Sequence, residues 1–160
     1  MLFRSPDRRG RLHDEDVASL RGFRKLLDEA FSTNLSIDAK TVASTFRGNA
    51  SVYSPCQLTD GSNETYWATD DNVSQGWVEI ILPKKTTVHF VLLQEYIALG
   101  QRVKSFSVNA WKEDQWQPVM QGTTIGYKRI LEIEPIETDK VRINFTSSKA
   151  SLVISNIALY

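Results

Sequence analysis

The stretch KSFSVNAW, residues 104–111, alternates apolar and polar side chains, with Phe106 and Val108 set among serines. Alternation with a period of two places one face of a β-strand on a core and the other face in solvent. The segment DKVRINFT, residues 139–146, repeats the pattern. Both segments therefore predict half-buried strands.

Other short apolar segments surround these two, and turn-forming residues separate them. The centre of residues 87–97 is almost wholly apolar, which indicates a strand covered on both faces. Seven or eight short strands without helices between them are typical of a β-sandwich or barrel. The additional strand segments are WVEIIL (77–82), TVHFVLLQEYI (87–97), WQPVM (116–120), RILEIE (129–134) and LVISNIALY (152–160).

The first part of the chain has a different period. The segment DEDVASLRGFRKLLDEAF, residues 14–31, predicts one amphipathic α-helix with Asp14 as its N-cap. An apolar face on a lone helix needs a partner surface, so we expect another part of a protein to cover it. Its apolar stripe consists of Val17, Leu20, Phe23, Leu27, Ala30 and Phe31.

The bulk composition excludes several classes of function. Lys and Arg number 19 and Asp and Glu number 19, so the formal net charge is zero, and no global charge attracts nucleic acid or an anionic membrane. No apolar run approaches the roughly 20 residues that span a bilayer, and the start MLFRSPDRRGRLHDED lacks the pattern of a signal peptide. Cys56 is the single cysteine, which excludes an internal disulfide and predicts a buried, small apolar side chain.

The polar segment QLTDGSNETYWATDDN, residues 57–72, carries the candidates for chemistry. Glycoside hydrolysis needs two facing carboxylates about 5–10 Å apart, whereas Asp70 and Asp71 are neighbours that diverge in an extended segment. His13 and His89 lack the surroundings of a catalytic base. We therefore predict no catalysis within this chain. The segment could instead wrap a hard cation such as calcium or form an ordinary turn. Its oxygen donors are Asp60, Asn63 and Thr65.

The sequence resembles discoidin-like domains, the galactose-binding-like modules related to the coagulation factor V/VIII C-type repeats, at LTDGSNETYWATDD, WVEIILPKKTTVHFVLLQEYIALGQRVKSFSVNAW and KVRINF. This resemblance covers residues 36–160 and implies an antiparallel jelly-roll β-sandwich. The variants LLQEYIALGQRV and GTTIGYKRI are similar to the C-terminal domain of family 29 α-L-fucosidases, which are retaining glycoside hydrolases. SPDRRGRLHDEDVASLRGFRKLLDEAFSTNL resembles the last turn and helix of their catalytic barrel, so residues 1–35 are expected to end such a barrel.

The resemblance implies an accessory domain that binds carbohydrate or docks onto the catalytic barrel of a parent α-L-fucosidase, outside the cytoplasm in an extracellular or periplasmic location. The alternative is that the chain itself hydrolyses α-L-fucosides of glycans. A protein- or lipid-binding module is a third option, although no exposed apolar or basic run is visible in the loops. The residues expected to bind sugar or to dock are Gln94, Glu95, Tyr96, Gln101, Arg102, Tyr127, Lys128 and Arg129. Among them, we expect the guanidinium of Arg102 or Arg129 to pair with the carboxylate of Glu95.

The resemblance also implies a structural ion, commonly calcium, inside the loop of residues 57–72. Trp67, together with Tyr66, is expected to point into the sandwich and anchor that loop. Asn156 stands where related domains often carry Glu, and an amide oxygen is a weaker calcium ligand than a carboxylate. The expected ligands are the carbonyl of Leu58, Asp60, Asn63, Thr65 and Asn156.

Overall fold

The computed structural model describes residues 9–160 and divides the chain into two compact units, Met1–Thr33 and Asn34–Tyr160. The first unit contains the helix α1, Asp14–Ala30, as predicted to within one residue. Its N-cap is His13 and not Asp14, because the carbonyl of His13 already accepts the amide of Val17. Residues 5–8 of the expected barrel turn lie outside the described residues. No helix in residues 9–160 is long and apolar enough to cross a membrane.

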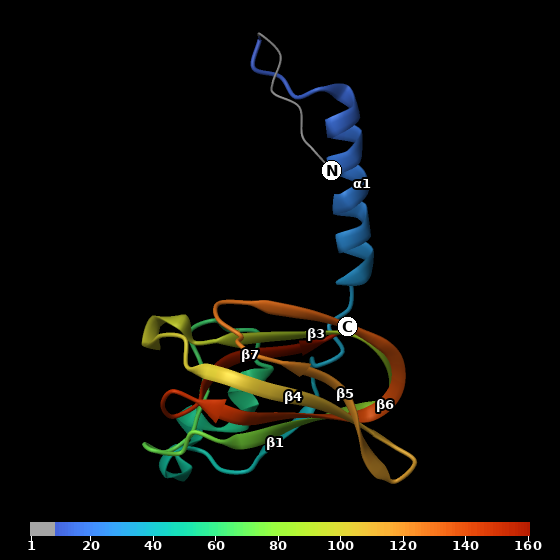
Figure 1. Cartoon of the computed structure of the whole chain (residues 1–160). Coiled ribbons are helices and arrows are strands. Elements are labelled where there is room, and N and C mark those ends of the chain that lie inside the picture. The colour runs from blue at the N-terminus through green and yellow to red at the C-terminus, as the bar shows by residue number, and fades with distance from the viewer. Residues whose placement is uncertain (1–8) are drawn as a thin grey trace. The chain divides into compact units, whose positions relative to one another are not determined.

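The second unit is built from antiparallel strands, in agreement with the predicted all-β sandwich (Figure 1). The strands are β1 (Lys40–Ala43), β2 (Trp67–Ala68), β3 (Gly76–Glu95), β4 (Val103–Lys112), β5 (Gln115–Gly122), β6 (Arg129–Ser148) and β7 (Val153–Leu159). Short 3-10 turns connect them: η1 (Arg47–Asn49), η2 (Ser51–Tyr53), η3 (Pro55–Leu58) and η4 (Ile97–Leu99).

Two long strands, β3 and β6, take part in both layers of the sandwich. The first half of β3 pairs with β1 and with the second half of β6, which also pairs with β4. The second half of β3 pairs with β7 and with the first half of β6. The sequence suggests separate strands at 77–82 and 87–97, whereas the structure has one strand with a register shift between Ile81 and Thr86. The apolar alternation lapses at this shift, where Pro83, Lys84 and Lys85 are exposed.

The core confirms the alternation on which the strand prediction rests. Phe106 and Val108 of β4 are buried, as are Ile143 and Phe145 of β6. Trp67 is fully buried as expected, where it stacks on Phe145 with ring centres 5.8 Å apart and donates its indole N–H to the carbonyl of Thr45. Burying one large apolar side chain stabilises the fold by about 1.5–3 kcal/mol.

Cys56 is exposed in η3, so the prediction of a buried thiol is wrong. Only one side of this short turn faces the core, and Leu58 occupies that side. The Sγ of Cys56 lies 2.9 Å from the Oγ of Ser54.

The outer face of the layer that contains β4 and β5 carries stacked rings and cations. The guanidinium carbon of Arg142 lies 4.8 Å from the ring centre of Trp77 and 4.2 Å from that of Trp116. The same guanidinium forms an ion pair with Glu79. Arg142 therefore links three strands through its flat faces and its edge.

Candidate functional site

Glu95, at the end of β3, ties two loops together. Its side chain is 2% exposed, and its carboxylate accepts the backbone amides of Arg102 at 2.7 Å, Val103 at 2.9 Å and Gly126 at 2.8 Å. The carboxylate is therefore satisfied by amides from the segment after η4 and from the segment before β6.

The predicted pairing of Glu95 with an arginine side chain is wrong. The guanidinium of Arg102 instead donates to Leu99 and Ser151, and that of Arg129 donates to the carbonyl of Thr124 at 2.5 Å. Backbone amides donate to the oxygens of the buried carboxylate, so no second charged group has to be buried beside it. Burying an arginine there would cost free energy because its charge would lose contact with water.

The other predicted residues divide between two hollows or lie outside both. Gln94 donates to the carbonyl of Tyr127 at 3.2 Å and accepts from the amide of Asn156 at 2.9 Å. Arg102 lies in a different hollow, and neither hollow includes Gln101, Lys128 or Arg129 in its lining. The first hollow, of about 340 Å³, is lined by Asn63, Glu64, Gln94, Glu95, Tyr96, Ile97, Ala98, Tyr127 and Ser155.

We call the second hollow the arginine hollow. It has a volume of about 250 Å³, and four separate segments of the chain assemble it. Apart from Arg102, its lining residues cannot be predicted as a binding site from the sequence, because no local motif marks residues that only the fold brings together. The lining residues are Arg47, Tyr53, Tyr66, Ala68, Asp71, Leu99, Arg102, Ser151 and Val153.

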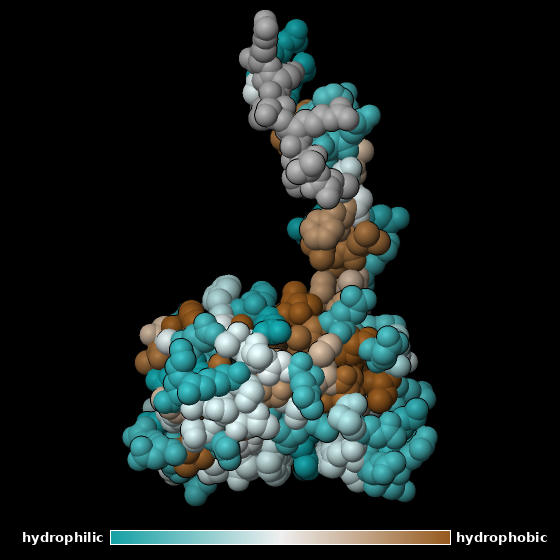
Figure 2. Space-filling model, viewed as in Figure 1, coloured by the Kyte–Doolittle hydropathy of each residue, from teal (hydrophilic) through white to brown (hydrophobic). Residues whose placement is uncertain are grey.

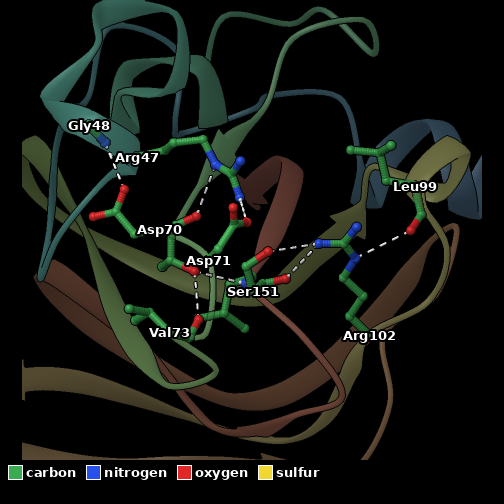
Figure 3. Close-up of polar contacts among 10 residues, drawn as sticks. Arg47, Gly48, Asp70, Asp71, Val73, Leu99, Arg102 and Ser151 are labelled. Atoms are coloured by element: carbon green, nitrogen blue, oxygen red, sulfur yellow. Dashed lines mark hydrogen bonds and ion pairs between the residues drawn. The ribbon is translucent and has the colours of Figure 1, made fainter.

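Two arginines reach the arginine hollow from opposite sides, with Asp71 and Ser151 between them (Figure 3). Arg47 donates its Nε to the carbonyl of Thr69 at 3.2 Å and its Nη2 to Asp71 at 2.5 Å. Arg102 donates its Nε to the carbonyl of Leu99 at 3.2 Å. Its Nη1 donates to the carbonyl and the hydroxyl of Ser151 at 3.0 and 2.9 Å. Among residues 9–160, Nη1 of Arg47 and Nη2 of Arg102 have no hydrogen-bond partner.

A row of tyrosines forms one wall of the arginine hollow. The ring of Tyr66 lies 5.6 Å from that of Tyr53 and stacks on that of Tyr96 at 4.6 Å. Tyr66 is therefore half-buried in this row and does not point into the core as expected. Since Tyr66 lines the arginine hollow and Tyr96 lines the other one, the stacked pair separates them. Burial, and secondarily the neighbouring Tyr53, raises the pKa of Tyr66.

Asp70 and Asp71 diverge as the sequence analysis predicts. Asp70 accepts the amide of Gly48 at 2.8 Å, whereas Asp71 accepts the guanidinium of Arg47. Gly48 has a φ of 56°, a left-handed conformation that glycine adopts without a steric penalty. Each carboxylate thus fixes the turn after β2 onto η1.

The residues expected to hold calcium are only partly brought together. Asp60 accepts the hydroxyl of Thr65 at 2.6 Å and the amide of Ser62 at 2.8 Å, which closes the loop on itself. Asn156 is hydrogen-bonded to Gln94. No group of three His, Cys, Asp or Glu side chains gathers in the described part of the chain. The expected ligands therefore offer calcium one carboxylate, that of Asp60, and neutral oxygens, and the ion stays a prediction.

Comparisons with known proteins connect this geometry to a family. Residues 39–158 match the F5/8 type C domain. The α-L-fucosidase 1 of Arabidopsis thaliana is 30% identical over 161 residues, which cover 97% of this chain and 31% of that protein. The GH29 fucosidase of Ruminococcus gnavus, solved in complex with fucose, superimposes with a TM-score of 0.86 at 29% identity, over 97% of this chain and 32% of its own.

A smaller module shares the sandwich alone. Chitosan-binding module 1 of a chitosanase/glucanase from Paenibacillus sp. IK-5 has a TM-score of 0.71 at 20% identity, over 80% of this chain and 98% of its own, which shows a common fold.

The chain spans about a third of the length of the fucosidases that it matches.

Proposed function

The chain belongs to the F5/8 type C domain family, and from this membership we propose that it is the accessory β-sandwich domain of an α-L-fucosidase-type glycoside hydrolase. In this role the chain contributes no catalytic carboxylates. Its helix α1 packs against the catalytic part, and the sandwich presents its hollows to glycans. The similarity to fucosidases supports this proposal because it extends over 97% of the chain and so includes both units.

The apolar face of α1 carries the docking half of the proposal. Leu20, Phe23 and Leu27 follow one another at helical spacing and are exposed, Phe23 by 59%. Figure 2 shows hydrophobic (brown) atoms at the surface of α1. A row of exposed large apolar side chains indicates an interaction surface. Burying a fully exposed side chain of this size contributes about 1.5–3 kcal/mol, and because these three are 37–59% exposed, docking would gain about half of that for each.

The charged face of α1 is suited to solvent. Arg24 pairs with Asp28, and Lys25 lies 3.7 Å from Glu29 across one turn. Such exposed pairs stabilise a helix by only about 0.3–0.5 kcal/mol each, so they do not replace a partner on the apolar side.

A fucosidase-depletion experiment tests the docking half. Antibodies against the sandwich, added to an extract of the source, should retain α-L-fucosidase activity on the beads. Activity that remains wholly in the supernatant contradicts the proposal. In the complete protein, Phe23→Glu should lower the melting temperature, whereas Arg21→Glu, which changes an exposed side chain on the opposite face of α1, should leave it nearly unchanged.

Carbohydrate binding is the second half of the proposed function, and the lining of the arginine hollow supports it. The hollow combines tyrosine rings with charged groups that are aimed inward, the arrangement that fixes small polar ligands in protein sites. Titration of the chain with monosaccharides, followed by NMR, tests this half: shifts of the amides around Ser151 are expected, and unchanged spectra with every saccharide contradict it.

A further inference from the structure

We propose that the arginine hollow binds a single pyranose ring carrying an anionic group, a carboxylate or a sulfate, and that Arg102 recognises this group. The inference rests on the carbohydrate-binding function proposed above and adds the class of sugar.

Within residues 9–160, no carboxylate pairs with the charge of Arg102. Its guanidinium donates only to neutral oxygens, those of Leu99 and Ser151, while the nearby carboxylate of Glu95 is occupied by backbone amides. Arg47 differs, because Asp71 pairs with it. The charged groups that line the hollow are thus two arginines and one aspartate, which leaves one positive charge for a ligand to neutralise.

Arg102 is held in place before any ligand binds. Glu95 fixes its backbone amide, Leu99 fixes Nε, and Ser151, which is itself buried, fixes Nη1 with two oxygens. Of the three guanidinium nitrogens of Arg102, only Nη2 has no hydrogen-bond partner among residues 9–160. A guanidinium already ordered in this way loses little conformational entropy when it binds an oxyanion, and its planar fork suits carboxylate and sulfate oxygens.

The size and the walls of the hollow suit one sugar ring. Small-molecule sites usually have volumes of about 300–1,000 Å³, so a hollow of about 250 Å³ has no room for a long oligosaccharide. The rings of Tyr53 and Tyr66 offer apolar surfaces for the C–H groups of a pyranose. Asp71 and the unpartnered Nη1 of Arg47 provide an acceptor and a donor for its hydroxyls.

A neutral sugar would contact the same lining residues as an anionic sugar, but it would provide no anion to pair with the guanidinium of Arg102. Charge-assisted hydrogen bonds are roughly twice as strong as neutral ones. We therefore expect the anionic group to raise the affinity at least tenfold over the neutral pyranoside.

Calorimetric titration of the 160-residue chain tests the proposal. The ligands are methyl β-D-glucuronide, galactose 6-sulfate, their neutral counterparts methyl β-D-glucoside and galactose, and sodium sulfate as a charge without a sugar. At least one anionic sugar should bind tenfold or more tightly than its neutral counterpart and than sulfate, and the tighter of the two identifies carboxylate or sulfate as the group.

Two variants and one spectrum assign the effect to Arg102. Arg102→Gln should abolish the preference for the anionic sugar, whereas Arg129→Gln, the same charge change outside the hollow, should keep it. In the unmodified chain, the Nε–H resonance of Arg102 should shift on adding the anionic sugar, which gives a result even where Arg102→Gln fails to fold.

Three outcomes overturn the proposal, and each has a distinct meaning. Equal affinity for neutral and anionic sugars leaves carbohydrate binding intact and removes the anion. Sulfate that binds as tightly as the sugar sulfate reduces the hollow to a simple anion site. No binding of any saccharide removes both the proposal and the carbohydrate-binding half of the proposed function, while docking through α1 is judged separately by the depletion experiment.

Discussion

The carboxylate of Glu95 accepts the backbone amide of Arg102 at 2.7 Å, so a buried acid at the end of β3 sets the position of a guanidinium in the arginine hollow. Because the same carboxylate also binds the amides of Val103 and Gly126, the order of two loops depends on one side chain.

Replacing Glu95 with Ala should lower the free energy of unfolding by about 2–4 kcal/mol, since three amides lose a charged acceptor. Urea unfolding measures the change. Glu132→Ala removes an exposed carboxylate from β6 and serves as the control, with an expected change within about 0.5 kcal/mol. A Glu95→Ala chain as stable as the control would show that the loops are held by other contacts.

Replacing Arg142 with Ala should cost about 1–3 kcal/mol of stability, because Glu79 loses its partner and two tryptophan rings lose a stacked cation. Arg142→Lys keeps the charge but not the planar group, so it should recover less than half of this loss. Denaturant unfolding of both variants gives the comparison. Full recovery by lysine would mean that charge alone accounts for the contribution.

Tyr66 should make the fold sensitive to alkaline pH. Burial raises its pKa in the folded state above the ordinary value of about 10, so the folded chain holds the phenol proton more tightly than the unfolded chain does. This contribution to stability is complete below about pH 10 and is lost as the pH rises through the folded-state pKa. Unfolding followed from pH 8 to 11.5 should show a steeper loss for the unmodified chain than for Tyr66→Phe. Parallel curves for the two proteins would exclude the effect.

Calcium should raise the melting temperature if the loop around Asp60 binds the ion as predicted. A ligand that binds only the folded state stabilises it by about 2.7 kcal/mol at a hundredfold excess over Kd. Asp60→Asn should remove the response, and Asp114→Asn, an exposed acid in the β4–β5 turn, should retain it. Identical melting in calcium and in chelator would remove the ion from the account.

The sequence predicted the strands well where burial alone decides the pattern. Phe106, Val108 and Ile143 face the core because a strand with one buried face requires alternation. Trp67 was also placed correctly, since a large indole in a polar loop needs a core to cover it. The helix α1 is also predicted correctly, because its apolar side chains recur at helical spacing.

The arginine hollow could not be predicted in the same way. Arg47 lies 55 residues before Arg102 along the chain, and no local pattern indicates that their side chains meet at one cavity. The hydrogen-bond partners of Glu95 are set by the loop amides that the fold places beside its carboxylate. The sequence does not show this placement, and the expected ion pair with an arginine is therefore wrong. Tyr66 was misplaced because its stacking partner Tyr96 is 30 residues away in the sequence.

The most direct measurement of the central claim compares the release of 4-nitrophenol from an aryl α-L-fucoside by the isolated chain and by the complete protein captured from its source, at equal molarity. The account predicts no release above background from the isolated chain and turnover by the complete protein, because the chain is an accessory domain. Turnover that stays with the isolated chain through purification and disappears in Asp71→Asn would contradict it.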